Sequence, residues 1–290
     1  MSELVCKNIS KAYKKKKVLH GIDLTIEQGK IYGLIGRNGA GKTTLLSVMT
    51  AQNPATGGEV ILDGMPVWEN QKALEHLCFS RELNTLSILG PNSVKVKEYL
   101  MMARMYYPNW DREMEKRLVE RFDLNVKKRI SKLSKGMLSM VTIIVALASK
   151  ADITILDEPV AGLDVVARTD FYQLLMEEHV NSGRTFIIST HIIEEAANVF
   201  EEVIFLKDGM ILLKENTQEL LERAVHVSGL AGEVDAACEG LTIHHVENIG
   251  RSKGVTVLLS AGQQLHPGHD VTVQPVSLQN LFVALCGREA

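Results

Sequence analysis

Short aliphatic runs separated by turn residues characterise the first part of the chain. Runs of this length that end at Gly, Asn or Asp are typical of β-strands. They cover residues 4–9, 18–26, 30–35 and 60–62. After the third run comes a glycine-rich turn, Gly36 to Gly41, and then residues 42–49, whose apolar positions have helical spacing. This segment therefore predicts a strand, a tight loop and a helix in direct succession.

Between about residues 73 and 150 the apolar positions favour helices, after which strand-like runs alternate with helical stretches. The helical candidates are 94–107, 112–122 and 138–148, followed by strands 153–156, 185–189 and 203–206 and helices 165–178 and 193–200. This later alternation is typical of a parallel sheet covered by helices. We therefore expect an α/β fold interrupted by a helical insertion.

The last part of the chain has a different character. A helix is predicted over residues 217–224, strands over 254–259 and 270–273, and a final helix over 278–286. We expect a main domain over residues 1–215, with its helical insertion at about 74–150, and a small α/β accessory domain over 216–290.

Composition and charge exclude several classes of protein. Hydrophobic residues at 46% and charged residues at 23% are those of a globular chain. The net charge of −3 gives no positive field for nucleic acid, and the lysine run at 14–17 is expected to be a solvated loop. The four cysteines are far apart and form no CxxC pair, which indicates a protein of a reducing compartment. The longest apolar stretch, residues 140–148, is too short to span a membrane, so we expect neither a span nor a signal peptide.

The glycine-rich turn matches the phosphate-binding pattern G-x-x-x-x-G-K-[ST]. Its residues are Gly36, Arg37, Asn38, Gly39, Ala40, Gly41, Lys42 and Thr43, with Thr44 next in the helix. Backbone N–H groups in such a turn point at phosphate oxygens, and the helix N-terminus adds its positive end. The pattern predicts a nucleoside triphosphate site, where Lys42 meets the β- and γ-phosphates and the Thr43 hydroxyl binds Mg²⁺.

Two acidic residues end the apolar run at 153–156. Asp157 can hold Mg²⁺, and Glu158 can act as the base that polarises a water. Acidic residues at a strand end are commonly a solvated turn, but the phosphate-binding turn in the same chain favours catalysis. ATP and Mg²⁺ are the predicted ligands.

Further motifs give the chain a resemblance to the nucleotide-binding subunits of ATP-binding cassette (ABC) transporters, over about residues 3–215. Residues 133–137, Leu-Ser-Lys-Gly-Met, resemble the family's LSGGQ signature, and residues 161–164 resemble its D-loop. His191 matches the switch histidine, and Tyr13 the aromatic residue that stacks on adenine. The resemblance implies a P-loop NTPase fold with a mainly parallel sheet and an antiparallel β region.

The resemblance also implies a mechanism that one chain cannot complete. Two such subunits face each other head to tail, and Ser134 and Gly136 of one contact the γ-phosphate held by the other. Glu158 orients the attacking water, His191 contacts the γ-phosphate, and Asp164 links the two sites. The implied partners are transmembrane permease subunits and a second ATPase subunit, the same or different, on the cytoplasmic face of the cell membrane.

Two departures from the family pattern stand out. The signature has Lys135 where Gly is usual and Met137 where Gln is usual. Glu82 occupies the position of the Q-loop glutamine, where a carboxylate can reach Mg²⁺ but repels a γ-phosphate. A glutamate here resembles certain antimicrobial-peptide and drug exporters, which favours export.

Other interpretations remain open. A soluble ABC ATPase acting on nucleic acid or ribosomes usually has coiled-coil insertions or two cassettes, which this chain lacks. A regulatory module that binds ATP without hydrolysis is suggested by Glu82 and the altered signature. A zinc site is not expected, because the spacing of His244, His245, His266, His269 and Cys238 fits no known ligand pattern.

Overall fold

The computed structural model describes residues 3–83, 94–260 and 262–287. The chain divides into two compact units, one comprising residues 1–191 and 204–213, the other residues 192–203 and 214–290. Ten residues of the expected helical region, 84–93, lie outside the described residues.

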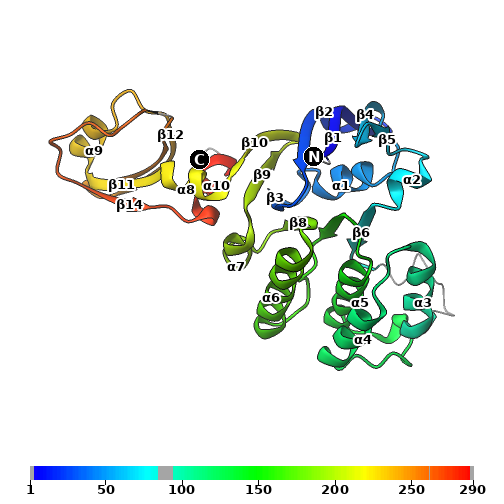
Figure 1. Ribbon diagram of the computed structural model, residues 1–290. Coiled ribbons are helices and arrows are strands. Elements are labelled where there is room, and N and C mark those ends of the chain that lie inside the picture. The colour runs from blue at the N-terminus through cyan, green and yellow to red at the C-terminus, as the bar shows by residue number, and fades with distance from the viewer. Residues whose placement is uncertain (1–2, 84–93, 261, 288–290) are drawn as a thin grey trace. The chain divides into compact units, whose positions relative to one another are not determined.

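Two sheets form the framework of the first unit (Figure 1). The antiparallel sheet has the order β2-β1-β4-β5, formed by β1 (Glu3–Tyr13), β2 (Lys16–Glu27), β4 (Gly57–Leu62) and β5 (Met65–Pro66). The second sheet has the order β10-β9-β3-β8-β7-β6, formed by β3 (Ile31–Gly36), β6 (Leu77–Arg81), β7 (Ile153–Asp157), β8 (Thr185–Thr190), β9 (Glu202–Lys207) and β10 (Met210–Asn216). Strands β3, β8, β7 and β6 are parallel. The expected α/β fold, with a mainly parallel sheet and an antiparallel region, is confirmed.

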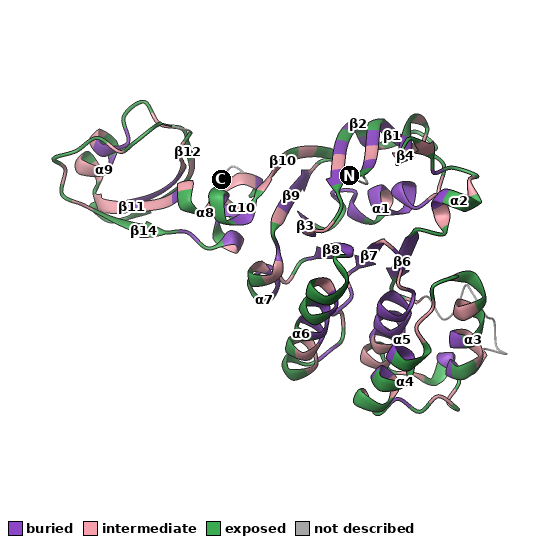
Figure 2. Ribbon diagram, in the orientation of Figure 1, coloured by how far each residue is buried: buried purple, intermediate pink, exposed green. Residues whose placement is uncertain are grey.

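The main core lies between these two sheets and around α1 (Lys42–Met49). It joins Leu4 and Ile26 of the antiparallel sheet, Leu34 of β3, and Leu45 and Leu46 of α1. Strands β3, β7 and β8 are buried along their whole length, as expected for parallel strands covered on both faces (Figure 2). Charged residues are absent from the described strands β3, β7 and β8 except for Asp157, which lies at the end of β7 where a loop begins.

Helices cover the rest of the first unit. They are α2 (Gln71–Leu74), α3 (Val96–Tyr106), α4 (Arg112–Arg121), a 3₁₀ turn η2 (Ile130–Lys132), α5 (Lys135–Ala148) and α6 (Val165–Ser182). Helix α5 is buried on most of its surface because it packs against β6, β7 and the helices α3, α4 and α6.

The structure corrects three details of the sequence prediction. Residues 77–81, inside the range expected to be mainly helical, form strand β6 of the parallel sheet. The helix expected at 138–148 begins at Lys135, because the Ser134 hydroxyl accepts a hydrogen bond from the Met137 N–H and caps it. The helix expected at 193–200 is one turn of α-helix, α7 (Ile193–Ala196), followed by a 3₁₀ turn, η3 (Ala197–Val199).

The second unit contains its own antiparallel sheet. The strands are β11 (Ala224–Leu230), β12 (Ile243–Ile249), β13 (Ser252–Leu258) and β14 (Val271–Pro275), in the order β12-β13-β11-β14. The helices are α8 (Thr217–Arg223), α9 (Ala231–Ala237) and α10 (Leu278–Cys286). Val227, Val255 and Val257 of the sheet and Val234 of α9 form a separate small core. Strands β11 and β12 and helix α9 were not predicted from the sequence.

Candidate functional site

The glycine-rich turn leads from buried β3 directly into α1. Gly41 precedes the helix with φ of 110°, a left-handed conformation that side chains strongly disfavour. The first backbone N–H groups of the helix, those of Lys42, Thr43 and Thr44, make no hydrogen bond within the described residues. Unpaired N–H groups at a helix N-terminus are the donors that bind phosphate oxygens, so the turn fits the phosphates of a nucleotide.

Lys42 is buried at the base of this turn. Its ammonium group donates a hydrogen bond of 2.7 Å to the carbonyl of Gly36 and lies 3.9 Å from Glu158 Oε1. Burial lowers the pKa of Lys42, while the nearby charges of Glu158 and Asp157 raise it. The turn thus places one desolvated cation where a polyphosphate would carry its charge.

Asp157, at the end of β7, connects three parts of the site. Its Oδ2 accepts a hydrogen bond of 2.7 Å from the hydroxyl of Thr43, and its Oδ1 accepts one from Ser189 at the end of β8. The Thr43 and Asp157 oxygens are hard ligands close enough to share one metal ion, so the pair fits Mg²⁺.

Glu158 follows with a left-handed backbone, φ 52°. Its N–H donates to both the carbonyl and the hydroxyl of Ser189, each at 3.1 Å, which fixes this unusual turn. The carboxylate is shared: Oε2 lies 2.7 Å from Nδ1 of His191, and Oε1 faces Lys42. The imidazole and the cation hold the carboxylate in its ionised form at the edge of the cavity, where it can orient a water and accept a hydrogen bond from it.

A cavity of about 420 Å³ opens over the turn. Its lining residues are Tyr13, Val18, Arg37, Asn38, Gly39, Gly41, Lys42, Thr43, Thr44 and Glu158. Gly36 and Ala40, also expected to contact phosphate, lie in the turn without lining the cavity. Tyr13 is 44% exposed, and the ammonium group of Lys11 lies 5.0 Å from the centre of its ring. An exposed aromatic ring at the edge of this cavity can stack on a base.

Two of the predicted site residues cap helices away from this cavity. Ser134 caps the N-terminus of α5, and Asp164 caps that of α6 by accepting a hydrogen bond of 2.9 Å from the Ala167 N–H. Gly136 packs so closely on the loop before α6 that an added Cβ would lie 2.7 Å from the Gly162 carbonyl. Ser139 also donates a hydrogen bond of 2.6 Å to the carbonyl of Ala161. The signature and the D-loop are therefore packed together within one chain.

Glu82 is also placed outside the cavity lining. Its carboxylate lies 3.3 Å from Lys135 Nζ, and both side chains are more than half exposed. The two charged departures from the family pattern therefore face each other in this chain.

The structure adds Ser189 and Val18 to the predicted set. Ser189 binds Asp157 and the backbone of Glu158, although it contributes no atom to the cavity lining. The sequence feature that could have pointed to Ser189 is a pair of polar residues, Ser189 and Thr190, at the end of a wholly buried strand.

Among the described residues, no helix has both the length and the apolar character that a membrane crossing requires.

Comparisons with known proteins agree with this geometry. Residues 19–161 match the family model described as ABC transporter. YtrB, an ABC transporter ATP-binding protein of Bacillus subtilis, is 28% identical over 97% of this chain and 97% of its own. AlbC, a putative ABC transporter ATP-binding protein of the same organism, is 32% identical over 67% of this chain and 83% of its own.

A solved ATP-binding subunit of an ABC transporter has the same fold. It superimposes with a TM-score of 0.65 at 23% identity, over 76% of this chain and 92% of that one. The phosphate-binding turn, the paired carboxylates and these relatives together identify the chain as an ATPase of the ABC transporter ATP-binding family.

Proposed function

We propose that this chain binds ATP with Mg²⁺ and hydrolyses it to drive transport through separate membrane-spanning partner subunits. The observation that carries the proposal is a connected set of side chains at one cavity. Lys42, Thr43 and Glu158 line this cavity, while Asp157 is bonded to Thr43 and His191 lies beside Glu158. Phosphoryl transfer depends mainly on positioning and on charge stabilisation, which these residues provide.

Each residue has a definite role in this proposal. The free N–H groups of α1 and the ammonium group of Lys42 hold the β- and γ-phosphates, and Tyr13 stacks on adenine. Thr43 and Asp157 hold Mg²⁺, and Glu82 is a further candidate ligand. When bound, Mg²⁺ neutralises charge on the phosphate oxygens. Glu158 accepts the proton of the attacking water, and His191 holds that carboxylate and contacts the γ-phosphate.

A second ATPase subunit completes the site. Ser134 and Gly136 lie outside the cavity of their own chain, and Ser134 is exposed. They are therefore available to the nucleotide of a facing subunit, with Asp164 at the junction of the two sites. That subunit is another copy of this chain or a different cassette.

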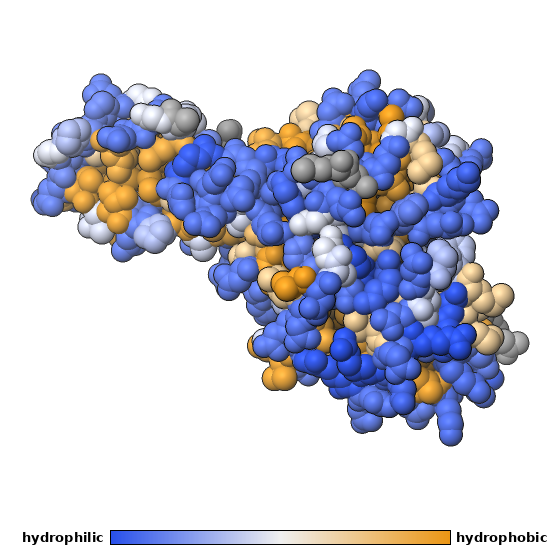
Figure 3. Space-filling view, in the orientation of Figure 1, coloured by the Kyte–Doolittle hydropathy of each residue, from blue (hydrophilic) through white to orange (hydrophobic). Residues whose placement is uncertain are grey.

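The helical region is the proposed docking surface for a permease on the inner face of the membrane. Helix α3 exposes a group of large apolar side chains that a partner can cover. They are Met101, Met102, Met105 and Tyr106, exposed by 44–84%. Figure 3 shows apolar side chains at the surface in this part of the unit.

Glu82 suggests export as the direction of transport. Residues 216–290 are proposed to be an accessory domain of the cassette formed by residues 1–215.

The Glu158→Gln variant tests the proposal. The amide keeps the size of the side chain but cannot accept a proton. We expect ATP binding to persist, turnover to fall by roughly 10² or more, and ATP with Mg²⁺ to trap a dimer in size-exclusion chromatography. Glu177→Gln, on the exposed surface of α6, is the matched control. Unchanged phosphate release would exclude Glu158 as the base, and absence of turnover in the unmodified protein with its partners would favour a regulatory ATP-binding module.

A further inference from the structure

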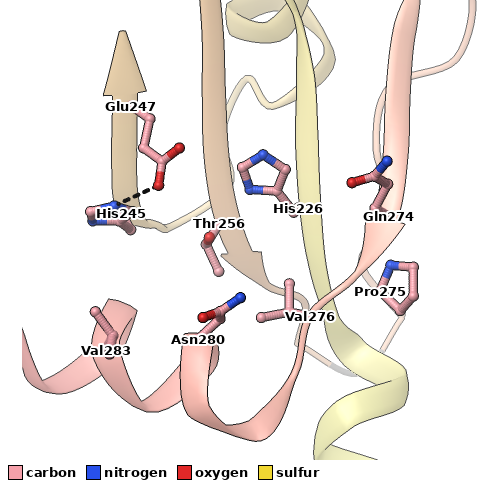
Figure 4. A pocket seen from close by; sticks show the side chains of 9 residues that line it. All are labelled: His226, His245, Glu247, Thr256, Gln274, Pro275, Val276, Asn280 and Val283. Atoms are coloured by element: carbon pink, nitrogen blue, oxygen red, sulfur yellow. Dashed lines mark hydrogen bonds and ion pairs between the residues drawn. The ribbon is translucent and has the colours of Figure 1, made fainter.

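One face of the C-terminal sheet carries a row of polar side chains. Strand register places His245 of β12 opposite Thr256 of β13, Thr256 opposite His226 of β11, and His226 opposite Gln274 of β14. Figure 4 shows the four side chains in this row. The alternate residues, including Val227, Val255 and Val257, point to the other face and pack with α9.

A β-bulge brings His245 into this row. The register of β12 against β13 shifts between Ile243 and His245, so His244 is the extra residue. Without it, His245 would occupy the opposite face, because a shift of one residue reverses every side chain of a strand. Glu247, two residues further on, also faces the row, and its Oε1 lies 3.2 Å from His245 Nε2.

Helix α10 and the segment before it close one side of the row. The result is a cavity of about 300 Å³, to which Asn280 adds an amide and Pro275, Val276 and Val283 add an apolar edge (Figure 4). This volume is at the lower end for ligand sites and suits a molecule of monosaccharide size. Gly254 leaves room for the His226 ring, since a Cβ there would lie 2.9 Å from its Cε1 atom.

The Thr256 hydroxyl opens onto this cavity. Thr256 is 5% exposed and lines the cavity, and its hydroxyl has no hydrogen-bond partner among the described residues. The side chains of half-buried His226 and of exposed Gln274 and Asn280 also have no partners there. These four polar groups therefore have hydrogen-bonding capacity that a ligand in the cavity can use in place of water.

The charge of the lining limits the chemistry of that ligand. Among the described residues, the lining contains one carboxylate, Glu247, and no Lys or Arg. A phosphate or carboxylate ligand would meet repulsion without a compensating cation. The imidazole, amide and hydroxyl groups all can accept hydrogen bonds, which suits a ligand rich in N–H and O–H groups.

We propose that this cavity binds a small polyhydroxylated amine, with its ammonium group at Glu247 and its carbon skeleton against Val276 and Val283. His226, Thr256, Gln274 and Asn280 take the hydroxyl groups. The site is formed entirely by the C-terminal unit, so the proposal does not depend on the ATP-binding role.

Three probes of one ring size test the proposal on the full chain: glucosamine, glucose and glucuronate. Calorimetry should give a millimolar or tighter dissociation constant for glucosamine, weaker binding of glucose and none of glucuronate, and glucosamine should shift the imidazole NMR signals of His226 and His245. Equal binding of glucose, preference for glucuronate, or no binding of glucosamine would overturn the proposal.

The Thr256→Val variant separates ligand binding from a structural role. Valine keeps the shape and removes the unpaired hydroxyl, so we expect glucosamine affinity to fall roughly threefold to tenfold while the melting temperature stays the same or rises. Thr272→Val, on the same face of β14 but outside the cavity, should leave affinity unchanged. Loss of thermal stability in Thr256→Val with unchanged affinity would assign the hydroxyl to the fold and contradict the proposal.

Discussion

The hydroxyl of Thr43 donates a 2.7 Å hydrogen bond to Asp157 Oδ2, although the two residues are 114 positions apart in the sequence. Thr43 lies in the first turn of α1 and Asp157 ends β7, so the bond joins the start of a helix to the end of a buried parallel strand. The two oxygens are hydrogen-bond partners and already lie side by side. Metal binding would therefore replace an existing hydrogen bond without first having to assemble the ligands.

Removing the Thr43 hydroxyl should raise the Mg²⁺ requirement of the ATPase. In Thr43→Val the Asp157 carboxylate remains but one oxygen ligand is lost. We expect at least a tenfold fall in rate at limiting Mg²⁺. Thr43→Ser keeps the oxygen and should remain near the unmodified rate. The measurement is phosphate release across a Mg²⁺ titration, and equal curves for Thr43→Val and Thr43→Ser would remove the hydroxyl from the metal site.

The Glu82–Lys135 pair should modulate the site weakly. Because both side chains are more than half exposed, the pair contributes about 1 kcal/mol at most. If Glu82 must leave Lys135 to reach the metal, Lys135→Gln should lower the Mg²⁺ requirement by no more than about fivefold, and Glu82→Gln should raise it. Lys132→Gln, exposed in the preceding turn, is the control. A Mg²⁺ dependence that is the same in all three variants would exclude Glu82 as a ligand.

Arg184 should be among the most destabilising residues to replace. Its guanidinium is 5% exposed and donates to the carbonyls of Ala146 and Leu147 at the end of α5, and to Glu178 at 2.9 Å. Arg184→Met leaves the two carbonyls unpaired and removes one of the two cations at Glu178, which keeps its bonds to Lys150. We therefore expect a loss of about 3 kcal/mol in the free energy of unfolding.

The Arg121–Asp170 ion pair provides a matched comparison for Arg184. It is partly exposed, so Arg121→Met should cost less than about 1 kcal/mol. Urea denaturation of both variants checks this, and equal midpoints would show that burial does not decide the difference.

Cys6 should lower the free energy of unfolding at alkaline pH. Burial, with a smaller contribution from Asp23, raises the pKa of its thiol from 9.0 to about 12. In the unfolded chain the thiol ionises above pH 9.0, while the folded chain keeps it neutral, so folding is penalised as pH rises from 9.0 towards 12 and is unaffected below 9.0. At pH 10.5 this penalty is about 2 kcal/mol. The difference between the urea midpoints at pH 8 and pH 10.5 should therefore be smaller in Cys6→Ala than in the unmodified protein. An equal difference in the two proteins would contradict the raised pKa of Cys6.

The residues of the candidate nucleotide site could be proposed from the sequence more readily than the contacts that surround them. The turn from Gly36 to Thr43 and the pair Asp157 and Glu158 stand in compact patterns whose chemistry dictates their spacing. Ser189 belongs to no such pattern, and its role depends on strand β8 lying beside β7. A contact between neighbouring strands is set by topology, which local spacing does not reveal.

The strands that the sequence did not predict have physical explanations as well. Strand β6, residues Leu77–Arg81, is short and follows a single helical turn, so its apolar residues fit helix and strand patterns equally. In β12 the bulge at His244 breaks the alternation that identifies a strand. The cavity in the C-terminal unit could not be predicted either, because its residues come together only through the pairing register of four strands.

The contact between Gly136 and Gly162 has a mechanical consequence. With the Gly162 carbonyl so close to Gly136, and Ser139 bonded to Ala161, the loop after Glu158 cannot shift without carrying the start of α5. The loop after Glu158 and the start of α5 are therefore expected to move together. In the proposed dimer, a movement that begins at the phosphate held by one subunit would thus reach Ser134 and Gly136, which face the nucleotide of the other subunit.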